Sequence, residues 1–481
     1  RDLHSFPTRR SSDLWQTIPY VNGAPHIGHA LDYCFADTYA RYQKLLGNTV
    51  RFQAGTDEHG NKISQKAKSL NLTPSAYVAK TTALFQDFIK ELNVEYTDFI
   101  RTTNPQHQRR CQKIWQKLQP YIYLAPYEGW YCDGCERFVT DQEYKIHHGT
   151  CPDHQKPYQK LSEQNYYFRL SVFKDKIYSA IKKHEMQILP AYRQTEILKL
   201  LKDTTDISIS RPISQLSWGI PVPGHNDQVM YVWIDALANY LTVLGYPDQD
   251  ISNWWPATAQ FVGKDILRFH AIIWPALLLG LELPLPRIIC SHGHILSHGQ
   301  KMSKSIGNVV DPIAVLKKHG VDAFRYFFLR HIDSFADSDF TWEKFEDAYQ
   351  NELANDLGNL IQRLATLSSN CKISLSPSAP NLPQSYTQFM DQFALNRAFD
   401  YVWTRIQALN KRIDDEKPWT LLKLGQTTEL SHCLSRLVQE LLDINFLLQP
   451  FIPTTAQKIA QIFQSHPITP PTPLFPKLHS N

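Results

Sequence analysis

The apolar and polar positions become regular from Trp15 onward and first predict a strand, a tight turn and a long helix. In residues 28–46, apolar side chains recur at intervals of three or four, which places them on one helix face, and Gly47 supplies a C-terminal stop. Residues 50–60 then have the pattern of a buried strand that ends in a polar loop. This order predicts the opening of a doubly wound α/β sheet, in which ligands bind where the strands end.

Three later stretches also have the pattern of strands, and the C-terminal part has the pattern of helices. The strand-like stretches are residues 228–237, 259–264 and 287–296. From about Phe345 onward, heptad-like apolar spacing predicts a helical bundle. The Pro- and Ser-rich residues 374–385 are predicted to form a loop between its helices.

Residues 120–211 interrupt the α/β pattern because they are rich in Pro, Gly, Cys and Tyr. They predict a module inserted between two halves of one sheet, residues 15–119 and residues 212–344. A helical domain is expected to follow at residues 345–481. The predicted fold class is therefore α/β, with a doubly wound, Rossmann-like parallel sheet, an inserted module and an all-α C-terminal bundle.

Residues 1–14 fit neither a strand nor a helix, because their apolar positions follow neither period 2 nor period 3.6. Our hypothesis is that this stretch is a non-native extension translated from foreign DNA, such as a sequencing adapter. The same codons found upstream of an intact gene in the source genome would contradict it.

Length and charge narrow the classes of protein further. With 481 residues, of which 43% are apolar, the chain can bury two or three domain cores. Its formal net charge of +4 is too small to indicate nucleic-acid binding by itself, so RNA contacts would depend on local basic pairs. The candidate pairs are Arg109 and Arg110, Lys182 and Lys183, and Lys411 and Arg412.

Compartment and redox state can also be predicted from the sequence. No stretch reaches the roughly 18 to 20 apolar residues needed to cross a membrane, and no signal-peptide pattern is present near the N-terminus. Eight cysteines are too few for a disulfide scaffold in a chain of this length. We therefore expect a cytoplasmic protein with reduced thiols and no membrane contact.

Three of the cysteines and one histidine have the spacing of a zinc site, C-x2-C-x15-C-x2-H. Four such ligands suit tetrahedral zinc and leave no open position for a substrate, so the ion is expected to be structural, with one per chain. The expected ligands are Cys132, Cys135, Cys151 and His154, with His147 and His148 as less well spaced rivals. The competing interpretation is three scattered core cysteines and a surface histidine.

A second motif, His26-Ile27-Gly28-His29, falls in the predicted turn before the first helix. Two imidazoles three residues apart share one face of a helical turn, beside free backbone N–H groups and the positive end of the helix dipole. Gly28 would let an adenine ring approach the backbone. The motif therefore predicts a phosphate-facing site, although a lone HxGH string is also found in ordinary turns.

A third motif, Lys301-Met302-Ser303-Lys304-Ser305, lies in a loop flanked by two glycines. Two lysines on such a loop can close over a triphosphate and neutralise the charge that develops as pyrophosphate leaves. An isolated KxxK is more often a solvated basic loop. Here both motifs occur in one predicted α/β domain, and in this order they resemble the HIGH and KMSKS signatures of class I aminoacyl-tRNA synthetases.

Further blocks resemble methionyl-tRNA synthetases from Trp15 to the end of the chain. They are WQTIPYVNGAPHIGH, AGTDEHG, the single zinc knuckle, YVWIDALANY, FVGKDILRFHAIIWPALL and KMSKSIGNVVDP. The resemblance implies a Rossmann-like catalytic domain with a zinc-knuckle insertion, followed by a helical anticodon-binding domain. It also implies an enzyme that activates L-methionine with ATP and Mg²⁺ and transfers it to the 3′ end of tRNA(Met).

The resemblance places three further sets of functional residues. The ATP-binding set is His26, Gly28, His29, Gly263, Lys264, Asp265, Lys301, Ser303 and Lys304, of which His26, His29, Lys301 and Lys304 are the expected catalytic residues. The methionine-binding set is Ile18, Tyr20, Asp57, Trp233, Ala236, Tyr240, His270 and Trp274. The anticodon-binding set is Asn359, Arg363 and Trp419.

The chemistry of these side chains agrees with the resemblance. Asp57 offers a carboxylate to the α-ammonium of an amino acid. The aromatic surround that favours a thioether is offered by Tyr20, Trp233 and Trp274. Tyr240 and His270 could donate weak hydrogen bonds to sulfur. The anticodon set offers an amide, a guanidinium and a stacking plane to unstacked bases. Read singly, each aromatic residue is more often part of a core than of a site.

The sequence departs from the family pattern at two places. Residues 1–14 replace the apolar residues that normally precede the T-x-x-Y block, so the first strand is expected to be short and Ile18 and Tyr20 poorly anchored. Leu237 stands where some members have Pro, which we do not expect to change the substrate. We also expect no counterpart of the extra C-terminal domain that some members carry, and a monomer without a stable protein partner.

Two other functions stay open from the sequence. A class I synthetase for Cys, Leu, Ile or Val is disfavoured, because residues 120–211 leave no room for the large editing domain expected of the last three and the anticodon set favours Met. A catalytically impaired paralogue that only binds tRNA is disfavoured by the intact HIGH and KMSKS motifs, but the unusual start of the chain keeps it open.

Overall fold

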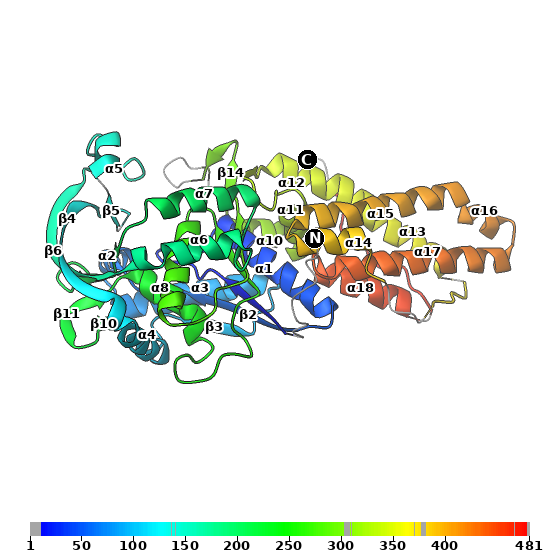
Figure 1. The fold of residues 1–481 in the computed structure, drawn as a ribbon. Coiled ribbons are helices and arrows are strands. Elements are labelled where there is room, and N and C mark those ends of the chain that lie inside the picture. The colour runs from blue at the N-terminus through cyan, green and yellow to red at the C-terminus, as the bar shows by residue number, and fades with distance from the viewer. Residues whose placement is uncertain are drawn as a thin grey trace. The chain divides into compact units, whose positions relative to one another are not determined.

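The structure is a computed structural model, and Figure 1 shows its ribbon. It describes residues 11–135, 137–139, 141–302, 308, 310–369, 371–376, 381–465 and 467–478. The chain divides into two compact units. The sheet unit comprises Arg1–Pro25, Thr49–Phe88 and Glu95–Ser291, and the helical unit comprises His26–Asn48, Ile89–Val94 and His292–Asn481.

A six-stranded sheet forms the centre of the sheet unit, with the strand order β3-β2-β1-β12-β13-β7. Strand β1 runs parallel to both β2 and β12, β2 runs parallel to β3, and β13 runs parallel to β7. The strands are β1 (Ser11–Gln16), β2 (Thr49–Thr56), β3 (Asp98–Arg101), β7 (Gln187–Leu189), β12 (Ala259–Gly263) and β13 (Ile288–His292). The strand order reverses direction between β1 and β12, which is where a doubly wound sheet binds its ligands.

The central strand begins earlier than the sequence pattern predicted. Strand β1 starts at Ser11, and Leu14 is paired with Phe52 on one side and with Ala259 on the other. Residues 11–14 therefore belong to the sheet, and the strand is six residues long rather than short. Residues 1–10 lie outside the described residues, and the foreign origin of this stretch stays a hypothesis.

The sheet unit has an aromatic core and contains several helices. They include α2 (Asn61–Ser69), α3 (Pro74–Glu91), α4 (Pro105–Leu118), α8 (Val232–Thr242), a π-helical turn (Phe269–Ile273) and α9 (Trp274–Gly280). The core contains the buried side chains of Trp15, Tyr240, Trp255 and Trp274. Burial of such large rings provides much of the hydrophobic stabilisation of the unit.

The prediction of a single strand over residues 228–237 was wrong. Strand β11 (His225–Met230) ends before Tyr231, and α8 then begins at Val232. Strand β11 belongs to a small antiparallel sheet with β9 (Ser210–Pro212) and β10 (Pro221–Val222), not to the central sheet. A continuous apolar run is compatible with both a buried strand and a buried helix, so periodicity could not separate them.

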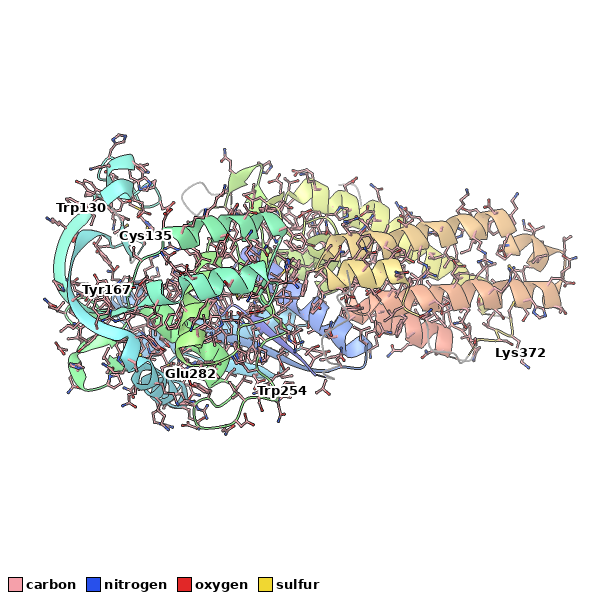
Figure 2. All side chains as sticks on the ribbon, viewed as in Figure 1. Trp130, Cys135, Tyr167, Trp254, Glu282 and Lys372 are labelled. Atoms are coloured by element: carbon pink, nitrogen blue, oxygen red, sulfur yellow. The ribbon has the colours of Figure 1, made fainter. Side chains whose placement is uncertain are left out.

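The inserted module contains a four-stranded sheet with the order β5-β4-β6-β8. Strands β4 (Ile122–Cys132) and β6 (Gln159–Phe168) form a long antiparallel pair, drawn in cyan in Figure 1, and Figure 2 labels Trp130 and Tyr167 on it. Its other elements are β5 (Arg137–Val139), α5 (Asp141–Ile146) and β8 (Ile207–Ser208).

Part of the predicted insertion belongs to the central sheet instead. Strand β7 pairs with β13, and it is flanked by α6 (Lys174–Lys182) and α7 (Ala191–Lys202). A three-residue strand is too short to produce a visible period-2 pattern. The inserted module therefore ends near Phe168, except that the later strand β8 pairs with β6 of its sheet.

The helical unit confirms the prediction of a C-terminal bundle. After the small strands β14 (Ile295–Ser297), β15 (Gln300–Lys301) and β16 (Ser338–Asp339), almost all elements are helices. They are α10 (Pro312–His319), α11 (Val321–Arg330), α12 (Trp342–Ala348), a π-helix (Tyr349–Gly358), α13 (Asn359–Ser368), α14 (Gln384–Asp391), α15 (Leu395–Glu416), α16 (Pro418–Lys423), α17 (Thr427–Leu448) and α18 (Pro453–Gln464). The long helices α15 and α17 lie side by side (Figure 1). No described helix is both long and apolar enough to cross a membrane.

Helix α1 (Ile27–Leu45) belongs to the helical unit and is fixed there by buried charges. Asp37, which is fully buried, accepts hydrogen bonds from Arg41 and Arg325, each at 2.7 Å. Arg325 also donates to the carbonyl of Phe451 at 2.8 Å. Charge-assisted bonds of this kind are strong and directional, so α1, α11 and the segment before α18 are held in one arrangement.

Candidate active site and zinc knuckle

The HIGH motif caps the first turn of α1. The backbone N–H of His26 donates to Nδ1 of His29 at 3.2 Å, and Nδ1 of His26 accepts from the N–H of Gly28 at 3.1 Å. The two imidazole rings stack with their centroids 3.7 Å apart. Burial and the neighbouring His26 lower the pKa of His29 well below its usual value, so this imidazole is neutral near pH 7.

A neutral His29 can interact with phosphate through a hydrogen bond rather than through a full charge. The glycine of the motif is also explained by the geometry, because a Cβ on Gly28 would lie 3.0 Å from the His26 ring. A larger residue would therefore displace the capping imidazole from the helix N-terminus.

The KMSKS motif lies largely outside the described residues. The backbone of Lys301 ends strand β15, but its side chain and residues 303–307, which include Ser303 and Lys304, are not described. The N-terminal anchor of the loop is described: the N–H of Gly299 donates to Asp339 at 2.9 Å.

The loops that follow β1 and β2 meet at the carboxyl edge of the sheet. Tyr20 and Asp57 form an isolated parallel bridge, with the N–H of Asp57 donating to the Pro19 carbonyl at 2.9 Å and the N–H of Val21 donating to the Asp57 carbonyl at 3.1 Å. Ile18 and Asp57 are buried. This bridge brings together the two loops that carry predicted methionine-binding residues. The loop after β1, which contains Ile18 and Tyr20, is therefore anchored by backbone bonds, contrary to the expectation of poor anchoring.

The close approach of these loops depends on Gly55. A Cβ at this position would lie 2.4 Å from the Ile100 carbonyl oxygen and 2.8 Å from Cγ2 of Ile18. No side chain fits there without moving the backbone. In the motif AGTDEHG, the first glycine is therefore required for packing, and Asp57 is the predicted ligand-binding residue.

The remaining predicted methionine-binding residues lie along α8, in the π-helical turn and at the start of α9. Tyr240 lies with its ring centroid 5.7 Å from that of Trp274, and Trp233 stacks on Phe269 at 3.7 Å. Ala236 and Trp274 are buried, whereas Trp233 is half-buried. Leu237 is buried within α8, so the residue that replaces Pro simply continues the helix. The structure thus brings the aromatic part of the predicted set into one cluster.

His270 and Tyr240 form a buried polar pair inside this cluster. Nδ1 of His270 donates to the Ile266 carbonyl at 3.1 Å, because a carbonyl oxygen can only accept. Burial lowers the pKa of His270 to about 4, so the ring is neutral and Nε2 has no proton. The Tyr240 hydroxyl must therefore donate to Nε2, at 2.9 Å. This differs from the prediction that both side chains donate, because only Tyr240 carries a usable proton.

The end of β12 brings further predicted residues to the same edge. Gly263 is the last residue of β12, and Lys264 and Asp265 follow it directly. One strand away, the Thr17 hydroxyl donates to the Phe261 carbonyl at 2.8 Å. The predicted ATP-binding residues are therefore divided between the two units: some lie at this edge of the sheet unit, and those of the HIGH motif and Lys301 belong to the helical unit.

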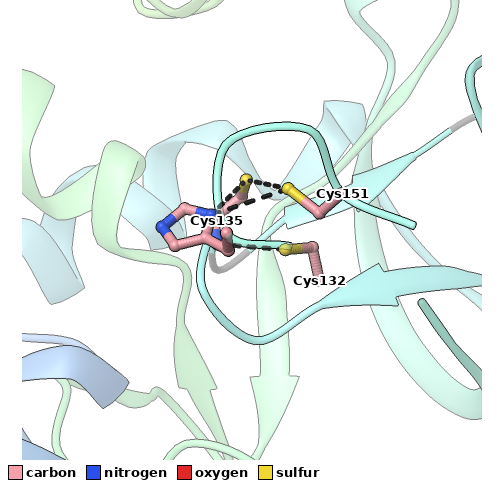
Figure 3. A group of neighbouring side chains, drawn as sticks. Cys132, Cys135 and Cys151 are labelled. Carbon is pink, nitrogen blue, oxygen red and sulfur yellow. Dashed lines mark hydrogen bonds between the residues drawn. The ribbon is translucent and has the colours of Figure 1, made fainter. Parts of the chain in front are cut away.

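The four predicted zinc ligands converge. Sγ of Cys135 lies 3.4 Å from Sγ of Cys151 and 3.4 Å from Nδ1 of His154, and all four donor atoms, including Sγ of Cys132, lie within 4.8 Å of one another (Figure 3). Ligand atoms on a tetrahedral zinc ion are roughly 3.4 to 3.8 Å apart, given Zn–N and Zn–S distances of about 2.1 and 2.3 Å. The residues therefore fit the ion.

Local chemistry supports the same four residues. Burial opposes ionisation of Cys151, but hydrogen bonds with His154 and the other two thiols lower its pKa to about 6, whereas burial raises the pKa of Cys135 to about 12. A Cβ on Gly134 would lie 2.3 Å from the His154 ring, so this glycine lets the histidine reach the thiols. The rival His147 bonds to Tyr158 at 2.9 Å instead.

In the helical unit, two of the three predicted anticodon residues are in contact. The guanidinium of Arg363 on α13 lies over the Trp419 ring, 5.5 Å from its centroid. Arg363 also donates to Asp414 at 2.5 Å. Asn359 is exposed one helical turn before Arg363. A stacked guanidinium and a half-buried indole offer the flat surfaces on which unstacked bases bind.

In two of the basic pairs suggested as RNA contacts, one arginine is neutralised locally. Arg412 donates to Glu416 at 2.8 Å and to Glu440 at 2.6 Å. Arg110 lies 3.2 Å from Asp248 and donates to the Thr242 carbonyl. These arginines contribute little net positive charge to attract phosphate.

Comparison with known proteins decides the family. A family model described as tRNA synthetases class I (M) matches residues 15–160 and 153–365. A methionine–tRNA ligase of Caldanaerobacter subterraneus subsp. tengcongensis is 40% identical over 463 residues, which cover 92% of this chain and 72% of that protein. The chain belongs to the methionine–tRNA ligase family. A second member, from Brucella suis, is 37% identical over 482 residues, covering 95% of this chain and 92% of that protein.

Solved structures of this family have the same fold. Methionyl-tRNA synthetase of Mycobacterium tuberculosis in complex with methionyl-adenylate matches with a TM-score of 0.88 and 33% identity, covering 97% of this chain and 100% of that chain. The apo form of the same protein matches with a TM-score of 0.83 and 30% identity, covering 99% of this chain and 100% of that chain.

Sequence reasoning missed a buried polar network behind the AGTDEHG loop of this family member. Glu58 is fully buried and accepts from Arg101 at 2.7 Å, and Trp218 donates to the Glu58 carbonyl at 2.6 Å. His59 is bonded to Asp235 at 2.6 Å. Glu58 and His59 stand beside Asp57 in the printed motif, but their partners are distant in sequence, and no local pattern identifies them.

Proposed function

We propose that this chain catalyses the ATP-dependent attachment of L-methionine to tRNA(Met). The observation that carries the proposal is the cluster of Tyr240, His270 and Trp274 in a chain that belongs to the methionine–tRNA ligase family. A thioether is favoured next to aromatic rings, and a single hydroxyl donor distinguishes it from a plain aliphatic side chain.

In this proposal, the residues at the carboxyl edge of the sheet bind the amino acid. Asp57 accepts hydrogen bonds from the α-ammonium group, and the aromatic cluster surrounds the side chain. When methionine binds, the Tyr240 hydroxyl can turn its proton from His270 to the sulfur. His270 acts by holding that hydroxyl, since its own Nδ1 proton is used by Ile266.

The reaction has two steps. The methionine carboxylate attacks the α-phosphate of ATP and pyrophosphate leaves; the ribose at the 3′ end of tRNA then attacks the carbonyl of methionyl-adenylate, and AMP leaves. Positioning and electrostatic stabilisation suffice for both steps. We assign phosphate contacts to His26 and His29 and to Lys301 and Lys304, with Mg²⁺ as the counter-ion of ATP.

The zinc knuckle has a structural role in the proposal. Cys132, Cys135, Cys151 and His154 would hold one Zn²⁺, which cross-links a module whose own core is limited to a few side chains. Metal analysis of the purified protein is expected to find one zinc per chain. A Cys151→Ser variant is expected to lose the zinc and to expose the β4–β6 hairpin to proteolysis, whereas the control Cys371→Ser should keep the metal.

Charging of tRNA(Met) with labelled methionine tests the proposed function. Charging with methionine, and none with leucine or cysteine, is the expected result. The alternative is a paralogue that binds tRNA without catalysis. Binding of tRNA(Met) without charging, under conditions in which methionine and ATP are saturating, would favour that alternative.

A further inference from the structure

A buried carboxylate in the sheet unit joins two histidines from different elements. Oδ2 of Asp235 lies 2.6 Å from Nδ1 of His59, and Oδ1 lies 2.6 Å from Nε2 of His107. The three side chains are at most 3% exposed. We refer to His59, His107 and Asp235 as the Asp235 cluster.

The Asp235 cluster is a hydrogen-bonded group rather than a metal site. Cys111 adds a fourth donor atom, 3.3 Å from Nε2 of His107, and His107, Cys111 and Asp235 are close enough together to be considered as ligands. However, two ligand atoms at about 2.1 Å from a tetrahedral ion are roughly 3.4 Å apart. A separation of 2.6 Å between His107 and Asp235 is that of a charge-assisted hydrogen bond.

Because Asp235 is charged and buried, the cluster is stable only while its hydrogen bonds are kept. Burial alone would raise the pKa of this carboxyl, but His59 and His107 outweigh it and the pKa is lowered, so the group is ionised. An ionised carboxylate in a dry core is tolerated only while its hydrogen bonds are made. Loss of either imidazole would therefore force the loop, the helix or both to rearrange.

The cluster connects two of the elements that carry predicted methionine-binding residues. His59 is two residues after Asp57, and Asp235 lies on α8 between Trp233 and Ala236. A second buried bond, from Gln53 on β2 to Asn239 on α8, runs parallel to this link. The loop after β2 and helix α8 are thereby joined by polar bonds at two points.

His107 comes from an element outside the predicted methionine-binding set. It lies on α4, where its Nδ1 is also 2.6 Å from the Thr242 hydroxyl near the end of α8. The imidazole therefore bonds to both the first and the last turn of α8, through Asp235 and Thr242. Helix α8 cannot slide along its axis or rotate without breaking one of these bonds.

We infer that His107 is a positioning residue for methionine recognition, acting through Asp235 and His59 on the loop that carries Asp57. The inference rests on the proposed function, since it concerns how the amino acid is held. A carboxylate must meet an ammonium group within a few tenths of an ångström of its best distance, and a shift of about 1 Å in such a contact is costly.

Steady-state methionine-dependent ATP–pyrophosphate exchange tests the inference, with KM measured separately for methionine and ATP. In His107→Leu, KM for methionine is expected to rise roughly 10-fold while KM for ATP changes less than about 2-fold. His107→Gln, whose amide can still donate to Asp235, is expected to recover most of the loss. The control Asn445→Ala removes a different buried hydrogen bond, to the Ala456 carbonyl in the helical unit, and should leave both KM values unchanged.

Thr242→Val provides a second variant in case His107→Leu does not fold. It removes only the hydroxyl that bonds to His107 and should raise KM for methionine roughly 3-fold. An unchanged KM for methionine in these variants, or an equal effect on both substrates, would overturn the inference while leaving the proposed function intact. A wild-type chain without any exchange would instead contradict the proposed function, and this inference with it.

Discussion

Tyr240 donates its hydroxyl proton to Nε2 of His270 across 2.9 Å, within the buried aromatic core of the sheet unit. The direction of this bond follows from the second nitrogen of the ring, because Nδ1 must donate to the Ile266 carbonyl. The pair therefore presents one hydroxyl proton that can be redirected, and no cation. This arrangement suits a neutral, weakly accepting sulfur better than a charged side chain.

Removal of that hydroxyl should weaken methionine binding. We expect Tyr240→Phe to raise KM for methionine by roughly 10-fold, equivalent to about 1.4 kcal/mol, with KM for ATP unchanged. Tyr386→Phe is a matched control, because Tyr386 is also fully buried and its hydroxyl donates to the Leu447 carbonyl in the helical unit. An equal rise in both variants would show that the effect is one of general stability.

The lowered pKa of His270 should make stability depend on pH. The unfolded imidazole titrates near 6.5 and the folded one at about 4, so the unfolded chain binds the extra proton first as the pH falls. Stability is therefore full above pH 6.5 and decreases between pH 6.5 and 4, by about 3 kcal/mol at most. His270→Gln should flatten this part of the profile in chemical denaturation experiments. A profile as steep as that of the wild type would exclude His270 as the cause.

Arg363 is expected to act on tRNA and not on methionine activation. Lysine lacks the planar guanidinium that lies over Trp419, so Arg363→Lys should lower kcat/KM for tRNA(Met) charging by roughly 10- to 100-fold. Pyrophosphate exchange should stay within about 2-fold of the wild type. Arg412→Lys, on α15, is the control and should leave charging unchanged, because Arg412 is occupied by Glu416 and Glu440.

Strand β1 lies in the middle of the central sheet, and it contains a buried polar residue. Gln16 is 1% exposed, and its side-chain oxygen has no hydrogen-bond partner among the residues that the structure describes. Gln16→Val should therefore stabilise the protein by about 1 kcal/mol and raise Tm by roughly 2 to 4 °C. The same change at the exposed Gln116 on α4 should give no increase. A lower Tm in Gln16→Val would show that the glutamine is well accommodated.

The elements predicted most accurately from the sequence are those whose ends are marked by nearby residues. The helix expected over residues 28–46 is observed as Ile27–Leu45, because its periodicity and Gly47 act within a few residues. The zinc spacing likewise pointed to four side chains whose donor atoms converge in the structure. In contrast, residues 228–237 contain no local signal that separates a buried strand from a buried helix, and β7 is too short to show a period.

The polar links behind the site could not be predicted, because their partners are far apart in the chain. His107 and Asp235 are separated by 128 residues, and Asp37 and Arg325 meet only in the folded helical unit. Each residue has an ordinary local context, so its partner becomes visible only when the tertiary structure brings them together. Both links involve helices that carry predicted ligand-binding residues, α8 for methionine and α1 for ATP.

Methionine-dependent ATP–pyrophosphate exchange tests the central claim most directly. It should be measured for the chain as given and for one in which residues 1–14 are replaced by a regular apolar strand. We predict exchange with methionine and none with leucine or cysteine, with higher activity after the replacement if the first residues are foreign. Absence of exchange from both proteins, with tRNA(Met) still bound, would contradict the proposed activity.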